Sequence, residues 1–456
     1  MSALPGTLDT GQQPPMTVPL RHFFVALGFL LAGIGVGIGL VVDAIPGAGR
    51  LAHVHLLLAG WVCLTIMGAM TQFVPVWSGT SLYSRRLASI QLVLVAVGLS
   101  GFALAFIVGA FIWLTGFGTV LLVGFWVFVY NVGRTVTTNH EYDVTERHFL
   151  FALLFFLLLT TFGIVLAINF TSSILSSVPV THGNVRGAHV TLAVFGAVLT
   201  TVYGALYQLG TMFTQTELHG IDHHLQSVEE GGHLGGVVLL ALGRLTDAVV
   251  VARIGAVLVL VAALAFAFVL GRKLFEMQVA WTPMHRRYTV AVPALAAWAV
   301  LSLPTWAADP TVPSHLLGAP GTVHLLVLGV VGFVVLGTLY HVIPFIIWVH
   351  QYSDLLGFED VPMIDDLYDD RLAMTDFVLV LGGTGLLVFS DITRVDSRLA
   401  AIGGVLVAAG IVVFLTNMLL VVRRHSPHSL DQIVLGSFPP RQDQEDADLT
   451  PSEQQP

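Results

Sequence analysis

Apolar residues occur along this chain in long runs that short polar stretches separate. Twelve runs approach or exceed the roughly 20 residues that a helix needs to cross the hydrocarbon layer of a bilayer. Because lipid cannot satisfy open backbone groups, each run predicts a helix, and the predicted fold class is an all-α polytopic membrane protein of about twelve transmembrane helices. Arg244 and Asp247 make the seventh run the least regular. The expected spans are 20–42, 54–77, 88–108, 110–132, 148–170, 187–212, 233–250, 254–272, 288–307, 322–348, 372–391 and 399–422.

Composition supports a membrane domain between two polar tails. The 456 residues are 55% hydrophobic and only 10% charged, which is too little charge for the surface of a soluble domain. Residues 1–19 are rich in Pro, Thr and Gln without a basic segment, so we expect a disordered tail and no cleavable signal. Residues 20–422 form the predicted transmembrane domain, and 423–456 a polar, acidic tail. The single cysteine, Cys63, excludes an internal disulfide and a Cys-ligated iron–sulfur or zinc site.

The charges indicate orientation and exclude nucleic acid as a partner. The formal net charge is −9, and Lys273 is the only lysine. Such an acidic, lysine-poor exterior is typical of a halophile, although a GC-rich genome also replaces Lys by Arg. Basic residues gather in the loops that are cytoplasmic if the N-terminus is inside, which predicts a plasma-membrane protein with both termini cytoplasmic. These residues are Arg85, Arg86, Arg134, Arg147, Arg272, Lys273, Arg286 and Arg287.

One sequence pattern occurs three times, at the start of the second, sixth and tenth runs. Its first three residues are HVH at 53–55, HVT at 189–191 and TVH at 322–324. Such a repeat indicates one structural unit used three times. The same positions of each copy then carry two glycines and a polar residue. These are Gly60, Gly68 and Thr71; Gly196, Gly204 and Tyr207; and Gly329, Gly337 and Tyr340.

The repeated histidines are candidate metal ligands. In the predicted orientation, His53, His55, His189 and His324 lie at one depth, near the outer face of the membrane. Histidine is costly in a bilayer unless it has a partner, and several at one depth favour bis-imidazole coordination of heme. A lone interfacial histidine more often bonds a loop carbonyl. The glycines would admit a flat ligand or simply a neighbouring helix.

These motifs resemble those of a known superfamily. Twelve spans with histidines on spans two, six and ten are similar to the catalytic subunit of heme–copper oxidases, which include the nitric oxide reductases. The resemblance implies an oxidase subunit I-like bundle and a low-spin heme b between His55 or His53 and His324. It leaves His53 and His189 for copper, non-heme iron or a second heme edge. Tyr203, Tyr207 and Tyr340 would bond heme propionates or a diatomic ligand, or only fill the core.

The second run also resembles the NnrS family of heme- and copper-containing proteins tied to nitric oxide stress. The shared pattern is the HVH triplet, Gly60, Gly68 and the PVWSG stretch at 75–79. Other positions depart from the oxidase pattern. Thr322 stands where the high-spin heme ligand is expected, and His223 and His224 are predicted in a cytoplasmic loop. The spans hold almost no acids that could relay protons, so a proton-pumping oxygen reductase is not expected.

The expected function is therefore a heme-binding membrane redox protein in electron transfer or in the handling of nitric oxide or oxygen. Its implied partners are heme, lipid and a small electron-donor protein or accessory subunits. One alternative is an active terminal oxidase or nitric oxide reductase with an unusual metal site. A second is a heme-free transporter that uses the small-residue helices for alternating access. The sequence contains no CxxCH, and it leaves open the gas, the donor and the number of hemes.

A second histidine cluster precedes the seventh run. Residues 219–233, HGIDHHLQSVEEGGH, carry His and carboxylate side chains that bind zinc, copper or iron in other proteins, but they equally suit a solvated loop. A longer seventh span would carry His233 into the membrane. The acidic stretch 352–371 is predicted to be a solvated surface loop, because it lacks the spacing of a calcium-binding loop.

Overall fold

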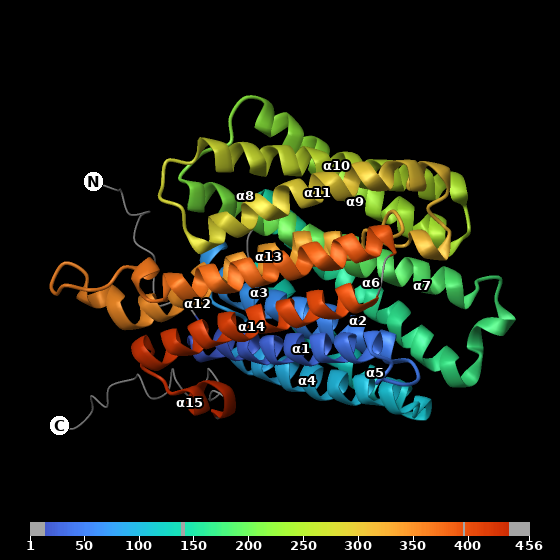
Figure 1. Cartoon of the computed structure of the whole chain (residues 1–456), viewed down its shortest axis with the longest axis horizontal. Coiled ribbons are helices and arrows are strands. Elements are labelled where there is room, and N and C mark those ends of the chain that lie inside the picture. Colours follow the sequence, from blue (N-terminus) through green and yellow to red (C-terminus); the bar gives the residue numbers. More distant parts are fainter. Residues whose placement is uncertain (1–13, 138–141, 395–396, 437–456) are drawn as a thin grey trace, which may run out of the picture.

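The computed structural model describes residues 14–137, 142–394 and 397–436, and this part of the chain is a bundle of long helices without strands (Figure 1). Several spans are continuous runs of more than one helical type. The spans are α1 (Thr17–Val41); α2 (Gly49–His55), η2 (Leu56–Cys63) and α3 (Leu64–Trp77); α4 (Arg85–Val108); α5 (Leu114–Val136); α6 (Val144–Ser172); α7 (His182–Thr191), η5 (Leu192–Leu199) and α8 (Thr200–Thr214); α9 (Ile221–Leu245); α10 (Val249–Glu276); α11 (Pro283–Ala308); η7 (Leu325–Gly332) and α12 (Phe333–Tyr352); α13 (Asp370–Thr393); and α14 (Ser397–His425).

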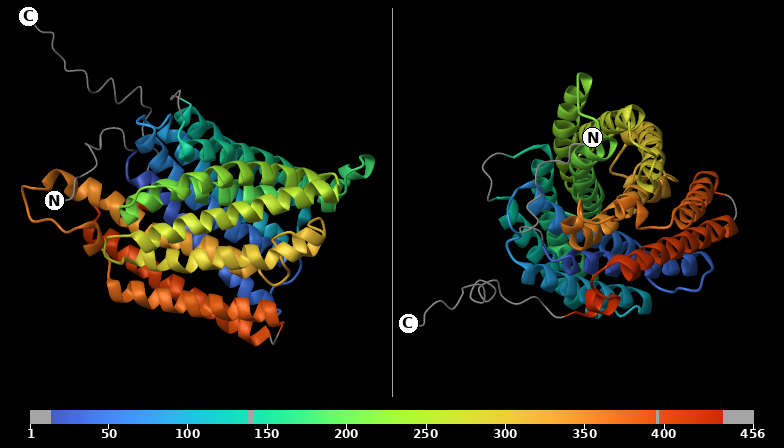
Figure 2. Two further views of the ribbon diagram at one scale, coloured as in Figure 1. Left: turned by 90° about the horizontal axis from the view of Figure 1, so that it is seen from above. Right: turned by 90° about the vertical axis from the view of Figure 1, so that its left-hand side faces the viewer.

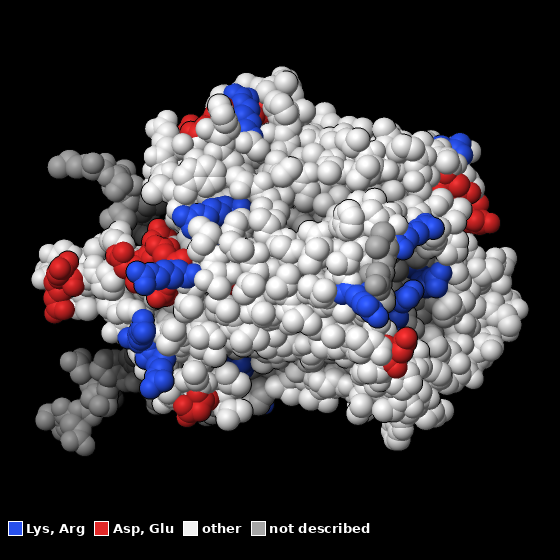
Figure 3. Space-filling model, viewed as in Figure 1, with Lys and Arg blue, Asp and Glu red and all other residues white. Residues whose placement is uncertain are grey.

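The bundle has the dimensions and surface of a membrane protein. Eleven described spans are long and apolar enough to cross a bilayer, and α9 adds a twelfth helix of 25 residues that carries more charge. Charged side chains gather toward the two ends of the molecule, with an uncharged band between them (Figure 3). Large apolar residues such as Leu104, Phe268 and Val300 are more than half exposed on the outside, as lipid-facing residues are. The predicted all-α polytopic fold of about twelve helices is confirmed.

The helices form three units of four spans, and each unit contains one copy of the repeat. The units run from α1 to α5, from α6 to α10 and from α11 to α14. In each unit the first span packs on the motif span, and the last two spans form a hairpin. Viewed along the helices, those of one unit lie side by side (Figure 2, right). The motif spans are the most buried: 72–83% of their apolar windows is covered, against 22–61% for the other candidate spans.

The seventh span differs from the prediction. It was expected at 233–250 after a polar loop, but α9 begins at Ile221 and ends at Leu245. The acidic groups of this stretch have partners on neighbouring helices, which is why the helix can continue through it. Asp222 pairs with Arg272 and Lys273, at 2.9 Å each, and Glu229 lies 3.2 Å from His148. The expectation of a solvated loop at 221–230 was therefore wrong.

The predicted tails are partly helical. Helix α1 begins at Thr17, and α14 continues to His425. The short helix α15 (Leu430–Leu435) then packs on α1, where the Arg21 guanidinium donates a 2.6 Å hydrogen bond to the Ile433 carbonyl. Residues 1–13 and 437–456, which hold the rest of both predicted tails, lie outside the described residues.

Candidate functional site

Each copy of the repeat contains a π-helical segment at the same position. The segments η2, η5 and η7 begin directly after His55, Thr191 and His324, and each is eight residues long. A π-helix is rare, and it often marks a functional site. The matching start and length show that the three copies are the same structural unit, as the sequence predicted. All three copies present their first residues at one end of the bundle, where α2 and α7 lie, which we call the histidine end (Figure 1).

The repeated glycines serve the packing of neighbouring helices. A Cβ at Gly60 would lie 2.7 Å from Phe29, and one at Gly196 would lie 2.9 Å from Phe155. At Gly329 the nearest side-chain atom is 3.2 Å away. Of the two roles that the sequence left open for these glycines, the structure therefore shows the close approach of a neighbouring helix.

All four motif histidines are fixed through the same ring nitrogen. In each, Nδ1 lies within hydrogen-bond distance of an oxygen that can only accept, so Nδ1 carries the proton. Nε2 makes no hydrogen bond to any described residue, and its lone pair is available, as in metal-ligating histidines. The Nδ1–oxygen pairs are His53 with the Gly33 carbonyl (2.8 Å), His55 with the Leu51 carbonyl (2.7 Å), His189 with the Leu159 carbonyl (2.8 Å) and His324 with the Asp391 carboxylate (2.6 Å).

The structure arranges the four histidines in two pairs. The ring centroids of His55 and His189 lie 6.5 Å apart, with ring planes inclined by 26°. A metal–nitrogen bond of about 2.1 Å on each side of one metal would place two opposed imidazole centroids about 6 Å apart, so this pair fits a shared metal. His324 lies close enough to interact electrostatically with His53. Of the two histidines left open as the partner of His324, His53 is thus the one nearby.

Residues outside the repeat form the walls around these rings. A Cβ on Gly37 of α1 would lie 2.5 Å from the His53 ring, and one on Gly163 of α6 would lie 3.2 Å from the His189 ring. Phe102 of α4 packs edge-on against His55, with centroids 5.3 Å apart. Sequence analysis missed both glycines, because nothing in the sequence indicates which helices adjoin the motif.

The spacing of glycines in α1 gives a direct test of this packing. We expect the free energy of unfolding of Gly37→Ala to be about 1–3 kcal/mol lower than that of Gly35→Ala, because the new methyl group must displace the His53 ring. Gly35 is the matched control, since a Cβ there meets nothing within 4 Å and the gain in helix propensity is the same. Thermal unfolding in detergent measures the difference. Equal stabilities would show that His53 is not held against α1.

A buried arginine without a carboxylate partner lies near the same end. Arg244 is 2% exposed, and its guanidinium donates to the Thr191 hydroxyl (2.7 Å) and to loop carbonyls at 310, 315 and 316. No described carboxylate pairs with it. Asp309 in that loop accepts hydrogen bonds from Thr311 instead, which lower the pKa of the Asp309 carboxyl. An uncompensated buried cation favours an anionic ligand group nearby. Sequence analysis noted Arg244 only as an interruption of the seventh span.

The candidate tyrosines are not brought to the histidine end. Tyr207 stands 18 residues after His189 along one continuous span, which is roughly 25 Å. Tyr340 is about four turns beyond His324 and hydrogen-bonds to Asp376. Both tyrosines belong to buried polar groups in the other half of the bundle.

The cluster at 219–233 does not assemble into a metal site. His223 and His224 are exposed on the first turns of α9, while His233 is fully buried and bonded to the Phe195 carbonyl at 2.9 Å. Within the described ranges, no group of three or more His, Cys, Asp or Glu side chains is placed to hold a metal ion.

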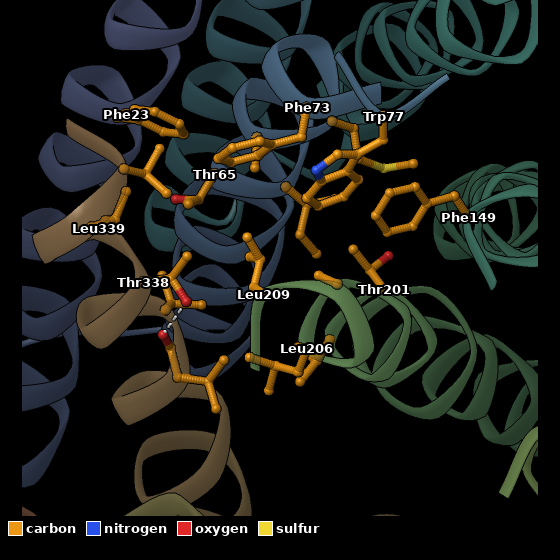
Figure 4. A pocket seen from close by; sticks show the side chains of 18 residues that line it. Phe23, Thr65, Phe73, Trp77, Phe149, Thr201, Leu206, Leu209, Thr338 and Leu339 are labelled. Carbon is orange, nitrogen blue, oxygen red and sulfur yellow. Dashed lines mark hydrogen bonds between the residues drawn. The ribbon is translucent and has the colours of Figure 1, made fainter. Parts of the chain in front are cut away.

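An apolar cavity lies between the three motif spans, away from the histidine end. Its empty volume of about 650 Å³ includes space open to the surroundings, and it is lined by side chains of α3, α8 and α12 together with Phe23 and Phe149 (Figure 4). Its walls include Phe73 and Trp77. Such a lining suits an uncharged, apolar molecule and would not hold an ion.

Fold and site together define a polytopic α-helical membrane protein with four imidazoles clustered at one end. Comparison with known proteins adds no closer identification. No family model matches the chain, and no curated protein matches it.

Proposed function

We propose that this protein is a heme-binding membrane redox protein and that His55 and His189 are the axial ligands of a b-type heme. Two neighbouring imidazoles, 6.5 Å apart between ring centroids and each with a free Nε2 atom, carry this proposal. Copper, zinc and non-heme iron take three or more protein ligands, and no such group exists among the described residues. Heme iron brings four equatorial nitrogens of its own and needs only two axial ligands, which is what this pair offers.

The protein's own residues hold and orient the group. The Leu51 and Leu159 carbonyls fix the two rings in one tautomer, so neither ring has to rotate before it binds iron. Arg244, which donates to the Thr191 hydroxyl two residues after His189, would supply positive charge for the heme propionates. When bound, the heme would exchange single electrons, which suits electron transfer. His53 and His324 form a second candidate pair at the same depth, with Asp391 as the partner of His324.

The alternative of an active oxygen or nitric oxide reductase is less favoured. That chemistry requires a second metal with an open coordination position, and the described residues assemble no group of three donors for it. The apolar cavity suits a gas such as oxygen or nitric oxide, so gas handling stays part of the proposal.

We also propose the orientation of the bundle. The positive-inside rule favours a cytoplasmic location for the end where α1 begins, because Arg85, Arg134, Arg147 and Arg286 lie at helix ends on that side. The histidine end then faces the outside of the plasma membrane, where a small donor protein or an accessory subunit would deliver electrons.

The proposal is tested by a reduced-minus-oxidised optical spectrum of the purified protein, recorded with and without CO, together with metal analysis. We expect a sharp b-type α-band that CO does not shift, because two imidazoles occupy both axial positions. A band that CO shifts, with copper or additional iron present, would favour the reductase. A featureless spectrum after expression with sufficient heme would reject heme binding and leave the transporter.

A further inference from the structure

A buried polar pair joins the first and third spans of each four-span unit. Each pair lies beside the second glycine of its motif, where a Cβ would contact the first member at 2.5–3.1 Å. The three pairs therefore occupy equivalent positions of the repeated unit. They are His22 with Gln91, His148 with Glu229, and Arg287 with Asp376.

The three pairs differ in charge. In the first, the Gln91 amide donates to the His22 ring at 3.4 Å, and both groups are neutral. In the third, Arg287 and Asp376 form an ion pair, to which Tyr340 also donates. Only the second pair consists of an imidazole and a carboxyl group, whose charges change with proton binding.

The geometry of the second pair, His148 and Glu229, indicates that it binds a proton. His148 donates Nδ1–H to the Val144 carbonyl at 2.7 Å, so a neutral His148 would point the lone pair of Nε2 outward. That nitrogen lies 3.2 Å from a Glu229 oxygen, and both side chains are fully buried. Two acceptors at this distance repel each other, and one proton between them converts the contact into a hydrogen bond.

Further polar groups beside this pair lack partners. The Tyr203 hydroxyl and Nδ1 of His233 are buried and make no hydrogen bond within the described part of the chain, while the buried Tyr207 hydroxyl faces Glu229. Both tyrosines interact electrostatically with Glu229, and the His233 ring lies 4.8 Å from that of Tyr203. Buried polar atoms usually bond to ordered water when protein partners are missing, so these groups fit a small hydrated site.

The pair is one residue away from an exposed ion pair on each of its helices. Arg147 directly precedes His148 on α6, and Glu230 directly follows Glu229 on α9. The side chains of Arg147 and Glu230 form an ion pair with contacts of 2.5 and 2.9 Å. Their side chains are 39% and 21% exposed, so water reaches this layer from the end where α1 begins.

We propose that His148 and Glu229 form a proton-binding site that is supplied from the end of the bundle where α1 begins. Uptake of one proton changes the pair from a net charge of −1 to zero. The charged and titratable groups that face it are Arg147, Glu230, His233, Tyr203 and Tyr207. A metal ion is the less suitable ligand, because no group of three donors forms among the described residues. The site is at the opposite end from the candidate heme ligands and does not depend on them.

Infrared difference spectra of the purified protein between about pH 5 and pH 9 test this site without reference to heme. We expect a carboxyl or imidazole transition that disappears in Glu229→Gln and also in His148→Gln, because one proton is shared by the pair. Gln91→Glu should introduce a second transition at the equivalent position beside His22. Spectra of Glu229→Gln and His148→Gln that match the parent would overturn the proposal, and no new transition in Gln91→Glu would contradict the equivalence of the pairs.

A second measurement uses the native chain, in case these variants do not fold. Dicyclohexylcarbodiimide reacts with protonated carboxyl groups in apolar surroundings. We expect mass spectrometry to find modification of Glu229 when the proton of the pair rests on its carboxyl group. A pH-dependent imidazole transition in the infrared spectrum of the native chain, without modification of Glu229, would place the proton on His148. Absence of both signals would reject a proton at this pair.

Discussion

Replacing His189 by alanine should remove the b-type heme from the purified protein. Removing a residue that only hydrogen-bonds to a metal ligand lowers metal affinity roughly 10–100-fold, and removing the ligand itself lowers the affinity further. We therefore expect the heme content to fall at least about tenfold. The measurement is the heme-to-protein ratio from the pyridine hemochrome spectrum. His55→Ala should have the same effect, because the centroids of the two rings are only 6.5 Å apart and both are proposed ligands of one heme.

Two other substitutions make this result specific. His223→Ala is the matched control, since that imidazole is exposed at the start of α9, and its heme content should equal the parent's. His324→Ala separates the two histidine pairs. If His324→Ala loses heme while His189→Ala retains it, the heme is bound by His53 and His324 and our assignment of the ligands is wrong.

The second large effect concerns stability. Asp376→Ala should destabilise the protein by about 3–5 kcal/mol, because Arg287 would keep its charge inside the bundle without a partner. Asp376 is fully buried, Arg287 is 1% exposed, and Tyr340 would lose its acceptor as well. The unfolding temperature in detergent should fall by several degrees or more.

An exposed ion pair provides the comparison. Arg147→Ala removes a bidentate contact to Glu230 whose side chains are 39% and 21% exposed. Water screens such a pair, so we expect a loss of about 1 kcal/mol or less. Similar losses for Asp376→Ala and Arg147→Ala would mean that water reaches the Arg287 pair, contrary to its burial.

The positions of the motif histidines along their helices could be predicted, because each position follows from the sequence of a single helix. The triplets at 53–55, 189–191 and 322–324 share a spacing to later glycines, and that spacing fixes their depth in the bundle. The π-helical segments confirm the common register. The lateral arrangement could not be predicted in the same way. A periodic apolar run indicates that a helix is buried, but it does not indicate which neighbouring helix covers which face.

The sequence by itself determined the fold class, the approximate number of spans, the threefold repeat and the depth of the histidines, because these follow from hydropathy and spacing along the chain. Only the tertiary structure decided that His55 lies beside His189, that Gly37 and Gly163 adjoin the rings, and that α9 continues through its acidic first turns. The physical reason is that these features depend on contacts between helices far apart in the sequence. A buried charge such as Glu229 is tolerated only where another helix supplies its partner.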